Sequence, residues 1–342
     1  MRKRASKETS EPFPVHENRE RLRRVKRVLV IKLGALGDVV IALAAIERIR
    51  QAHPEAEITV LTTPPFAALF AACPWVDRVE ADGRPKGLAA FLKLAERLRR
   101  ARYDRVYDLQ TSDRSAALHW ALLPFAPEWS GIAPFASHPH RNPRRDFMHA
   151  LEQKADQLKS AGVWPDAPTE PGAAPPPNLA FALDPARPER RPEAFGLSGA
   201  PYALLVPGGS AHRPEKRWPV ERWAELAARL SAQGLATAVV GGPQEGELAR
   251  AIPRALDLTG RTDLLQLASL GARAALAVGN DTGPTHVLAA AGAPTLVLFS
   301  RFSDPALSAP RGPRVEVLRR DQLAELSVES VFAALESLQR SA

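Results

Sequence analysis

The stretch "ALAVGNDTGPTHVLAAAGAPTLVLFS", residues 275–300, decides the fold. Two short apolar runs, 275–280 and 294–300, have the length of buried strands, and the segment 284–292 between them opens with Pro and closes with Gly, as a helix does. Two buried strands joined by a helix lie parallel in one sheet, because a parallel connection has to cross back over the sheet. The stretch therefore predicts an α/β fold with helices on both faces of the sheet.

The same alternation runs through the rest of the chain. Strands are expected at 27–33, 57–63, 77–81, 103–110, 202–210 and 236–243, and helices at 65–72, 87–101, 219–234, 264–274 and 327–340. Nine prolines between Pro165 and Pro192 interrupt the pattern and indicate a linker. The predicted division is a flexible basic extension (1–26), an N-terminal domain (27–164), a Pro-rich linker (165–200), a C-terminal domain (201–326) and a C-terminal helix (327–342) that could pack back on the N-terminal domain.

Length and composition narrow the class of protein. A chain of 342 residues suits two domains, and 45% hydrophobic with 25% charged residues is typical of a globular protein. One cysteine excludes an internal disulfide and fits a reducing cytosol, and no apolar run approaches the ~20 residues of a membrane span. The net charge of +8, with a basic N-terminal segment, is compatible with nucleic acid, an anionic membrane or a phosphorylated substrate, or with a solvated tail.

The triplet Asp281-Thr282-Gly283 is one that aspartic proteases use. Those enzymes need two such carboxylates sharing a proton, and this chain contains no second D-[TS]-G and places its single one between a strand and a helix. At a helix N-terminus, Thr282, Gly283 and the N–H groups after Pro284 instead form a site for an anion. Asp281 then either caps the helix or contacts a hydroxyl group, and His286 adds a proton-bearing contact.

A second turn of this kind, "GALGDVV", follows the first strand. Its glycines allow backbone N–H groups to approach a ligand, but the G-x-G-x-x-G dinucleotide fingerprint is absent. Asp38 lies at the carboxyl end of the strand, where open α/β sheets bind ligands. From position alone it is either a helix N-cap or a functional carboxylate.

Two further turns belong to the C-terminal half. In "PGGSAHRPEKRWPVERW" (207–223) a flexible loop precedes Lys216, which is either a surface lysine or a cation placed for a diphosphate. Trp218 and Trp223 are expected to be packing residues. In "GGPQEGELAR" (241–250), Glu245 either accepts a hydrogen bond from a sugar hydroxyl or complements the helix dipole.

Histidines and arginines gather in "PFASHPHRNPRRDFMHA". His138, His140 and His149 lack the further ligands that a metal site needs, so a solvated loop is expected and no metal. The nearby arginines form either a basic surface or a site for phosphate or carboxylate sugars.

The combination of these motifs resembles glycosyltransferase family 9, the ADP-heptose:lipopolysaccharide heptosyltransferases. The resemblance rests on "VLVIKLGALGDVVIALAAIERIR", "PGGSAHRPEKRWPVERWAEL" and "TGRTDLLQLASLGARAALAVGNDTGPTHVLAAAGAPTLVLFS", and it extends from about residue 27 to 340. It implies a GT-B fold, in which two Rossmann-like domains face each other across a cleft. The segment before Lys216, "SAHRPE", departs from the hydroxyl residues usual in the family, and the basic extension lies outside the family core.

The resemblance also implies the roles of individual residues. Asp38 is the general base, and Lys216 supports the leaving diphosphate. The donor-binding set is Gly209, Ser210, Lys216, Glu245, Asp281, Thr282, Gly283, Pro284 and His286. The acceptor-binding set is Gly37, Arg114, Arg141, Arg144 and Arg145. No cofactor or metal is implied.

The expected activity is inverting transfer of a heptose from ADP-heptose to the lipopolysaccharide inner core, either Kdo-lipid A or a heptosylated core. The enzyme is expected in the cytoplasm, peripheral at the inner face of the inner membrane and in contact with anionic lipid. Two alternatives remain: a family 9 transferase with another nucleotide-sugar or acceptor, and a non-catalytic nucleotide-sugar-binding protein. Retention of Asp38 argues against the latter. A nucleic-acid partner is not expected, because no nucleic-acid motif is present.

Overall fold

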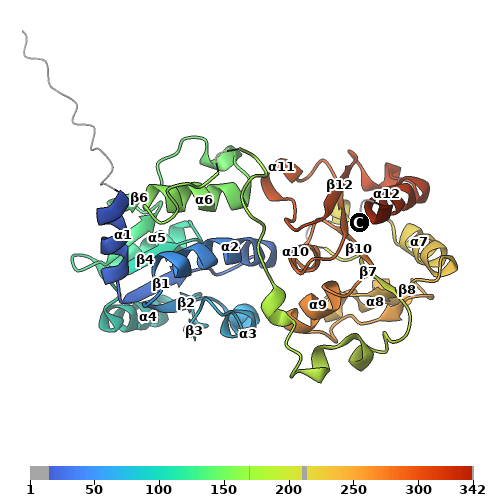
Figure 1. The fold of residues 1–342 in the computed structure, drawn as a ribbon, viewed down its shortest axis with the longest axis horizontal. Helices are drawn as coiled ribbons and strands as arrows, with labels where there is room; N and C mark the ends of the chain where they lie inside the picture. The colour runs from blue at the N-terminus through green and yellow to red at the C-terminus, as the bar shows by residue number, and fades with distance from the viewer. Residues whose placement is uncertain (1–14, 169, 210–213, 341–342) are drawn as a thin grey trace, which may run out of the picture.

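The computed structural model describes residues 15–168, 170–209 and 214–340. They form two lobes side by side, each built on a six-stranded parallel sheet with helices on both faces (Figure 1). The α/β class predicted from the sequence is therefore confirmed.

The sheet of the N-terminal lobe has the strand order β3-β2-β1-β4-β5-β6. Its strands are β1 (Arg27–Ile31), β2 (Glu57–Leu61), β3 (Arg78–Glu80), β4 (Arg105–Asp108), β5 (Glu128–Gly131) and β6 (His138–Pro139). One face is covered by α2 (Leu36–Ala52), α3 (Ala67–Ala71) and α6 (Ala150–Ser160), whose apolar side chains share one core cluster. The other face is covered by α4 (Leu88–Ala101) and α5 (Asp113–Leu122). The turns at the carboxyl ends of these strands, and the helices that begin there, point toward the second lobe (Figure 1).

The sheet of the C-terminal lobe has the order β12-β11-β10-β7-β8-β9. Its strands are β7 (Tyr202–Val206), β8 (Ala236–Val239), β9 (Leu256–Asp257), β10 (Leu276–Asn280), β11 (Thr295–Phe299) and β12 (Val315–Arg319). Its helices are α7 (Val220–Ala232), α8 (Gly246–Arg250), α9 (Leu264–Gly271), α10 (Gly283–Ala290), α11 (Pro305–Ser308) and α12 (Val328–Arg340). Apolar side chains of α9 and α10 belong to the same core cluster as those of α2, so one core runs through both lobes.

The C-terminal helix α12 packs on the C-terminal lobe, beside α7 (Figure 1). Val331, Leu335 and Leu338 are buried in one cluster with Trp223 and Leu226 of α7. The sequence suggested a return to the N-terminal domain instead. The apolar face of an amphipathic helix requires burial but does not specify the partner, and here the outer face of the second sheet supplies it.

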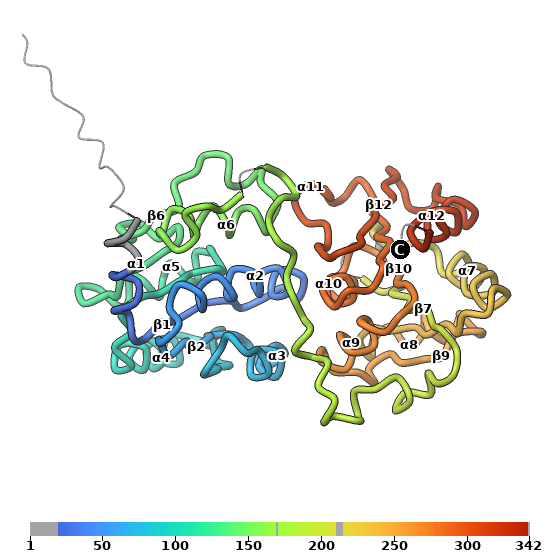
Figure 2. Tube along the Cα trace, in the orientation of Figure 1, coloured from blue at the N-terminus to red at the C-terminus, as the bar shows by residue number. Residues whose placement is uncertain are grey.

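The Pro-rich segment crosses between the lobes, as the light green tube of Figure 2 shows. It contains three short 3₁₀ turns, Ala180–Ala182, Pro188–Arg190 and Pro192–Phe195. Leu179, Phe195 and Leu197 are buried in the main core cluster, and the turns contact α9. The linker is therefore packed along the C-terminal lobe over part of its length.

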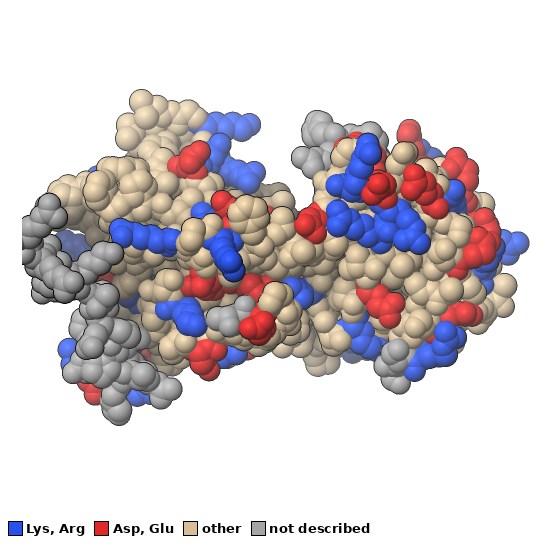
Figure 3. Space-filling view, turned by 90° about the horizontal axis from the view of Figure 1, so that it is seen from above, with Lys and Arg blue, Asp and Glu red and all other residues tan. Residues whose placement is uncertain are grey.

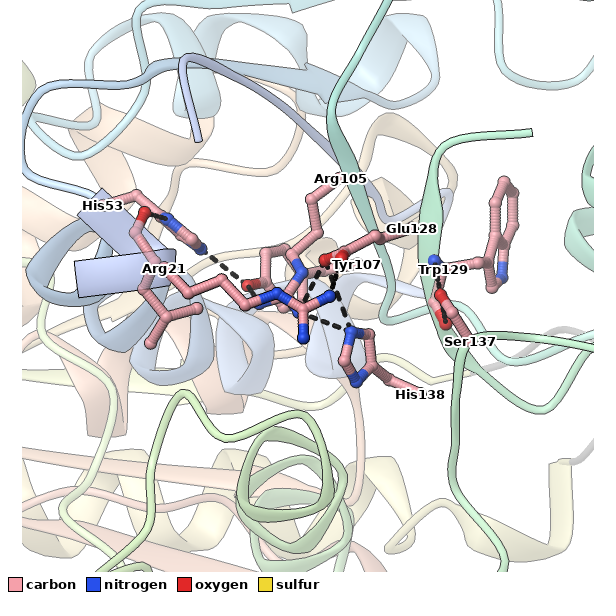
Figure 4. Close-up of polar contacts among 9 residues, drawn as sticks. Arg21, His53, Arg105, Tyr107, Glu128, Trp129, Ser137 and His138 are labelled. Atoms are coloured by element: carbon pink, nitrogen blue, oxygen red, sulfur yellow. Dashed lines mark hydrogen bonds and ion pairs between the residues drawn. The ribbon is translucent and has the colours of Figure 1, made fainter. Parts of the chain in front are cut away.

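Part of the basic extension is also folded. Residues Val15–Arg24 form α1, which lies at the far end of the N-terminal lobe (Figure 1). Leu22 is buried, and its carbonyl accepts a hydrogen bond of 2.7 Å from Nδ1 of His53, while Arg21 pairs with Glu128 (Figure 4). The expectation of a flexible extension is therefore wrong for residues 15–24, and residues 1–14 lie outside the described part.

A network of polar side chains joins α1 to the edge of the N-terminal sheet (Figure 4). Glu128 binds Arg105 at 2.8 Å, and Arg105, 2% exposed, also contacts His138. Burial lowers the pKa of His53 to about 4, so its neutral ring donates to the carbonyl of Leu22 and accepts from the Tyr107 hydroxyl. The network ties α1 to three strands of the sheet.

Charges of both signs are interspersed over the face seen in Figure 3, where a waist separates the two lobes. Among the described helices, none has the length and apolar character needed to cross a membrane.

Candidate active site

The carboxyl end of strand β10 forms the floor of the candidate site. Asn280 is fully buried, and its amide donates to the carbonyls of Pro207 and Gly208 at 2.8 and 3.1 Å. Its Oδ1 accepts the backbone N–H of Trp218 at 3.2 Å. One side chain thus joins two segments that sequence motifs predicted separately, its own turn and the 207–223 segment. Asn280 was not among the predicted site residues, although a polar residue ending a buried strand was a usable signal.

A cavity of about 430 Å³ opens above these turns, a volume that suits a nucleotide. Its lining combines glycine-rich backbone, a few polar groups and an apolar side. The lining residues are Leu36, Val206, Gly208, Gly209, Gly241, Gly242, Gln244, Glu245, Thr262, Asp263, Leu264, Leu267, Thr282 and Pro284. All except Leu36 come from the C-terminal lobe. The predicted donor residues Gly209, Glu245, Thr282 and Pro284 are therefore brought together, and Ser210 lies outside the described residues.

Glu245 is the buried acid of this cavity, with 7% of its surface exposed. It occupies the N-cap position of α8 without a side-chain capping bond, and its Oε2 has no hydrogen-bond partner among the described residues. A Cβ on Gly208 would lie 2.5 Å from Cγ of Glu245, so only glycine allows the carboxylate this position. Both sequence interpretations remain open: the position at the amino end of α8 suits an acid that complements the helix dipole, and the unpaired Oε2 at the cavity is available to a sugar hydroxyl.

Lys216 and Asp281 form an ion pair beside the cavity, with Nζ 3.0 Å from Oδ2. The two side chains are 16% and 11% exposed, so Lys216 is not a solvated surface lysine. Asp281 does not cap α10 either, because the N-cap is Thr282, which makes no side-chain capping bond. Trp218 and Trp223 are 2% and 0% exposed and stack edge to face, which confirms that they are packing residues.

Asp38 lies in the first turn of α2, next to Gly37, which is in close contact with His286 of the C-terminal lobe. The N-cap of α2 is Ala35, so the N-cap interpretation of Asp38 is wrong. Its half-buried side chain makes no hydrogen bond with any described residue, which leaves both carboxylate oxygens available.

The two lobes meet at Gly37 and His286. A Cβ on Gly37 would lie 2.9 Å from Cδ2 and Nε2 of the His286 ring, so glycine permits the two turns to approach this closely. Burial lowers the pKa of His286 to about 4, and the nearby charges of Asp281 and Asp38 oppose that shift. The ring is therefore neutral near pH 7 and retains a single N–H. Gly283, at the start of α10, touches Leu36 in the same contact.

Beneath Asp38, the N-terminal lobe holds two buried lysines that the sequence did not single out. Lys32 follows β1 and is 2% exposed, and Lys154 of α6 is 5% exposed. Burial lowers the pKa of Lys32 to about 7 and lowers that of Lys154 as well. In both cases the charge of Asp38 partly opposes the shift, which places all three groups in one electrostatic cluster.

The predicted acceptor arginines are dispersed on the N-terminal lobe. Arg114 lies in the first turn of α5, and Arg141 and Arg144 are exposed in the loop before α6. Arg145 is half-buried, and its charge lowers the pKa of Lys154, so it is the one placed nearest to the Asp38 cluster. The acceptor-binding roles of these residues remain predictions.

The histidines of the same region are not in a solvated loop. His140 is 4% exposed and lies 2.7 Å from Oδ2 of Asp156. His149, also 4% exposed, donates from Nε2 to the carbonyl of Ala309 at 2.9 Å. Among the described residues, no group of three or more His, Cys, Asp or Glu side chains is placed to share a metal ion.

A buried carboxylate connects the lobes near His149. Glu152 is 3% exposed and accepts from Arg311 at 3.2 Å and from the backbone N–H of Gly172 at 2.8 Å. Its Oε2 lies 3.1 Å from Nδ1 of His149. One residue of α6 thus contacts the linker and the loop after α11, which fixes how the walls of the cleft face each other.

Two Rossmann-like lobes that meet around a nucleotide-sized cavity define the GT-B class of glycosyltransferases. The model of glycosyltransferase family 9 (heptosyltransferase) matches residues 91–334, more than half of the chain, and the chain belongs to this family. The protein is thus a glycosyltransferase.

Individual relatives agree with this assignment. The lipopolysaccharide heptosyltransferase 1 of Pseudomonas aeruginosa is 32% identical over 294 residues, covering 80% of this chain and 78% of that protein. The solved structure of E. coli ADP-heptose lps heptosyltransferase II has a TM-score of 0.78 at 23% identity and covers 92% of this chain and 99% of that one, which shows a shared fold. E. coli heptosyltransferase WaaC, solved with ADP-2-deoxy-2-fluoro heptose, has a TM-score of 0.70 at 25% identity, with 91% and 99% covered.

Proposed function

We propose that this glycosyltransferase moves a heptose from ADP-heptose to the inner core of lipopolysaccharide, on Kdo-lipid A or on a heptosylated core. The observation that carries the proposal is the contact of Gly37 with His286, which places an unpaired carboxylate beside the donor cavity. The donor is supported by the relative solved with a fluoro-heptose analogue of ADP-heptose, and the acceptor by the names of the relatives.

The donor occupies the C-terminal lobe in this proposal. The apolar side of the cavity, with Leu264 and Leu267, receives the adenine ring, and Glu245 accepts from the ribose hydroxyls. The diphosphate lies at the amino end of α10, where unpaired N–H groups and the helix dipole favour an anion. Lys216 turns from Asp281 to the diphosphate, and Asp281 then becomes available to the sugar.

The reaction is a direct displacement with inversion. Asp38 accepts the proton of the acceptor hydroxyl, and the hydroxyl oxygen forms a bond to the anomeric carbon of the heptose. The bond from that carbon to the phosphate oxygen breaks, its electron pair stays on the oxygen, and ADP leaves. Lys216 and the α10 amino end stabilise the charge that grows on the diphosphate. We propose that no metal is required, and chelation with EDTA should therefore leave ADP release unchanged.

We also propose that the enzyme works in the cytoplasm, at the inner face of the inner membrane, in peripheral contact with anionic lipid. The acceptor is itself anchored in that membrane in this proposal, and the basic balance of the chain favours an anionic surface. Binding to vesicles with and without anionic lipid tests this contact independently of catalysis.

The decisive experiment follows ADP release with ADP-heptose and defined core acceptors, in the wild type and in Asp38→Asn. The variant should lose turnover by a factor of about 10²–10⁴, the usual contribution of a general base. Its affinity for ADP should stay near the wild-type value, because Asp38 does not line the nucleotide cavity. Full activity of Asp38→Asn would remove the base assignment, and release of ADP only with another nucleotide-sugar would change the donor.

A further inference from the structure

Lys32 and Lys154 are buried without ion-pair partners. Lysine is almost never buried to this degree unless it is paired, because an uncompensated ammonium in the interior costs several kcal/mol. Among the described residues, neither side chain lies within ion-pair distance of an acid, and Lys154 Nζ donates only a long hydrogen bond of 3.4 Å to the Ala150 carbonyl. Two such groups in one place need an explanation other than stability.

The fold brings the two lysines to the same edge of the sheet. Ile31 pairs with Asp108 across β1 and β4, so Lys32 leaves the sheet at the point where β4 also ends. Gln157 of α6 donates to the Asp108 carbonyl at 3.0 Å, which sets α6 across this edge. Lys154 lies one helical turn before Gln157 on α6, on the same side. The first turn of α2, with Asp38, starts from this edge too, and α2 packs along α6.

Asp38 is the anion that the two lysines share. Its charge raises the pKa of both Lys32 and Lys154 against the effect of burial, whereas the charge of Asp108 raises the pKa of Lys32 only. Burial raises the pKa of Asp108 to about 6, and its Oδ1 already accepts the N–H groups of Gln110 and Thr111. The other oxygen of Asp108, Oδ2, is buried without a partner among the described residues, and its charge raises the pKa of Lys32 as well. Asp108 therefore acts on Lys32 alone, whereas Asp38 acts on both lysines.

Other charged groups face this cluster from the surrounding elements. From the N-terminal lobe, Arg84 after β3 acts on Lys32 and Arg145 before α6 acts on Lys154, and both lower the lysine pKa. From the C-terminal lobe, His286 of α10 senses the charges of Asp281 and Asp38, and it is neutral near pH 7. The surroundings of Asp38 are therefore predominantly positive on the N-terminal side.

We propose that Lys32 and Lys154 are positioning residues that keep Asp38 ionised and fixed toward the cleft while bound substrates exclude water. This inference rests on the proposed role of Asp38 as the base. A carboxylate that loses its hydration is driven toward its neutral form, which cannot accept a proton, and two buried lysines behind it counter that tendency in their protonated form. They act through Asp38 and do not line the nucleotide cavity.

The test compares pH profiles of kcat/KM for the wild type, Lys32→Met, Lys154→Met and the double variant. Methionine keeps the length and removes the charge. Each single variant should move the acid limb of the profile to higher pH by about one unit, the lower end of the effect of one nearby opposite charge, and the double variant should move it further. On the acid limb, kcat/KM of a single variant should fall by up to about tenfold relative to the wild type. The Kd for ADP should stay constant, because the change is confined to the N-terminal lobe.

Two controls separate charge from structure. Lys159→Met removes an exposed lysine from the same helix and should leave the profile unchanged. Lys32→Arg keeps the positive charge and should keep the acid limb at the wild-type pH even if the absolute rate falls. Normalised profiles of Lys32→Met and Lys154→Met that superimpose on the wild-type profile would overturn the proposal.

A reciprocal measurement covers the case in which a methionine variant does not fold. In wild type and Asp38→Asn, carbon-13 NMR of the lysine ε-carbons reports the titration of Lys32 and Lys154. Neutralising Asp38 should move both titrations to lower pH, because the shared anion is gone. Unchanged titrations would overturn the inference even if Asp38→Asn is inactive. Conversely, an active Asp38→Asn enzyme would refute the base assignment itself, so the two failures are distinguishable.

Discussion

Glu245 offers the sharpest test of the donor site, because its carboxylate is buried with one oxygen unpaired. The substitution Glu245→Gln keeps the shape of a side chain that is 7% exposed and walled by Gly208 and Gly241. It removes the negative charge and leaves one carbonyl oxygen in place of two carboxylate oxygens. Any change in nucleotide affinity therefore reports the hydrogen bonds of the carboxylate and not a change in packing.

The expected size of the effect comes from the hydrogen bond that is lost. A hydrogen bond to a charged group contributes about 1.5–3 kcal/mol, and at about 2 kcal/mol the Kd for ADP rises roughly 30-fold. The free protein should respond in the opposite direction. An unpartnered buried carboxylate destabilises the fold, so Glu245→Gln should unfold at a higher temperature than the wild type in the absence of nucleotide.

Calorimetric titrations with ADP, 2′-deoxy-ADP and 3′-deoxy-ADP form a double-mutant cycle. The wild type should bind at least one deoxy analogue more weakly than it binds ADP. Glu245→Gln should bind that analogue and ADP with nearly equal affinity, because the substitution has already removed the hydrogen bond. Glu247→Gln, on the same short helix with a side chain 90% exposed, is the matched control and should bind like the wild type. A Glu245→Gln variant that binds ADP as tightly as the wild type and still discriminates against the deoxy analogues would refute the ribose assignment.

Two further predictions concern pairs of charged residues. Asp281→Asn should free Lys216 for the diphosphate, so ADP binds several-fold tighter while heptose transfer slows, and weaker ADP binding in calorimetry would contradict this. Arg311→Ala should lower the free energy of unfolding by about 2 kcal/mol at neutral pH, since Glu152 loses a partner between the lobes. Although burial acts to raise it, the pKa of Glu152 lies below its ordinary value because of His149 and Arg311, so this stabilisation is present above about pH 4.5 and lost as pH falls. Denaturant unfolding of the wild type and Arg311→Ala at several pH values tests this prediction. A difference in the free energy of unfolding that grows as pH falls would count against it.

The sequence revealed the elements whose burial is continuous and apolar. Strands such as β1, β7 and β10 are buried along nearly their whole length, and each was predicted within two residues of its observed start. Helix α6 was not predicted, because Glu152, Lys154 and Gln157 lie on its buried side and hide the apolar period. The short strands β5 and β6 and helix α5 were missed as well, since brief segments give little period to read.

In the candidate site too, local motifs could be predicted from the sequence, whereas contacts between distant residues could not. Motifs located Asp38, Glu245 and Lys216 because glycine-rich turns at strand ends are recognisable locally. The pairing of Lys216 with Asp281 depends on residues 65 positions apart, and no local pattern specifies it. Lys32 was read as part of a strand, and only the packing of α6 over the sheet reveals that its charge is buried.

The facing of α2 and α10 accounts for the distribution of charge in the cleft. Both helices begin at the contact between the lobes, so two positive helix ends converge on one place. In the free protein, Asp38 and Asp281 offset these ends, and Lys216 occupies Asp281. In the donor pose proposed above, the diphosphate brings negative charge to α10, so Lys216 exchanges Asp281 for the diphosphate, while Lys32 and Lys154 stay beside Asp38. In the proposed mechanism the counter-ions of Asp38 belong to the N-terminal lobe, so the diphosphate does not recruit them.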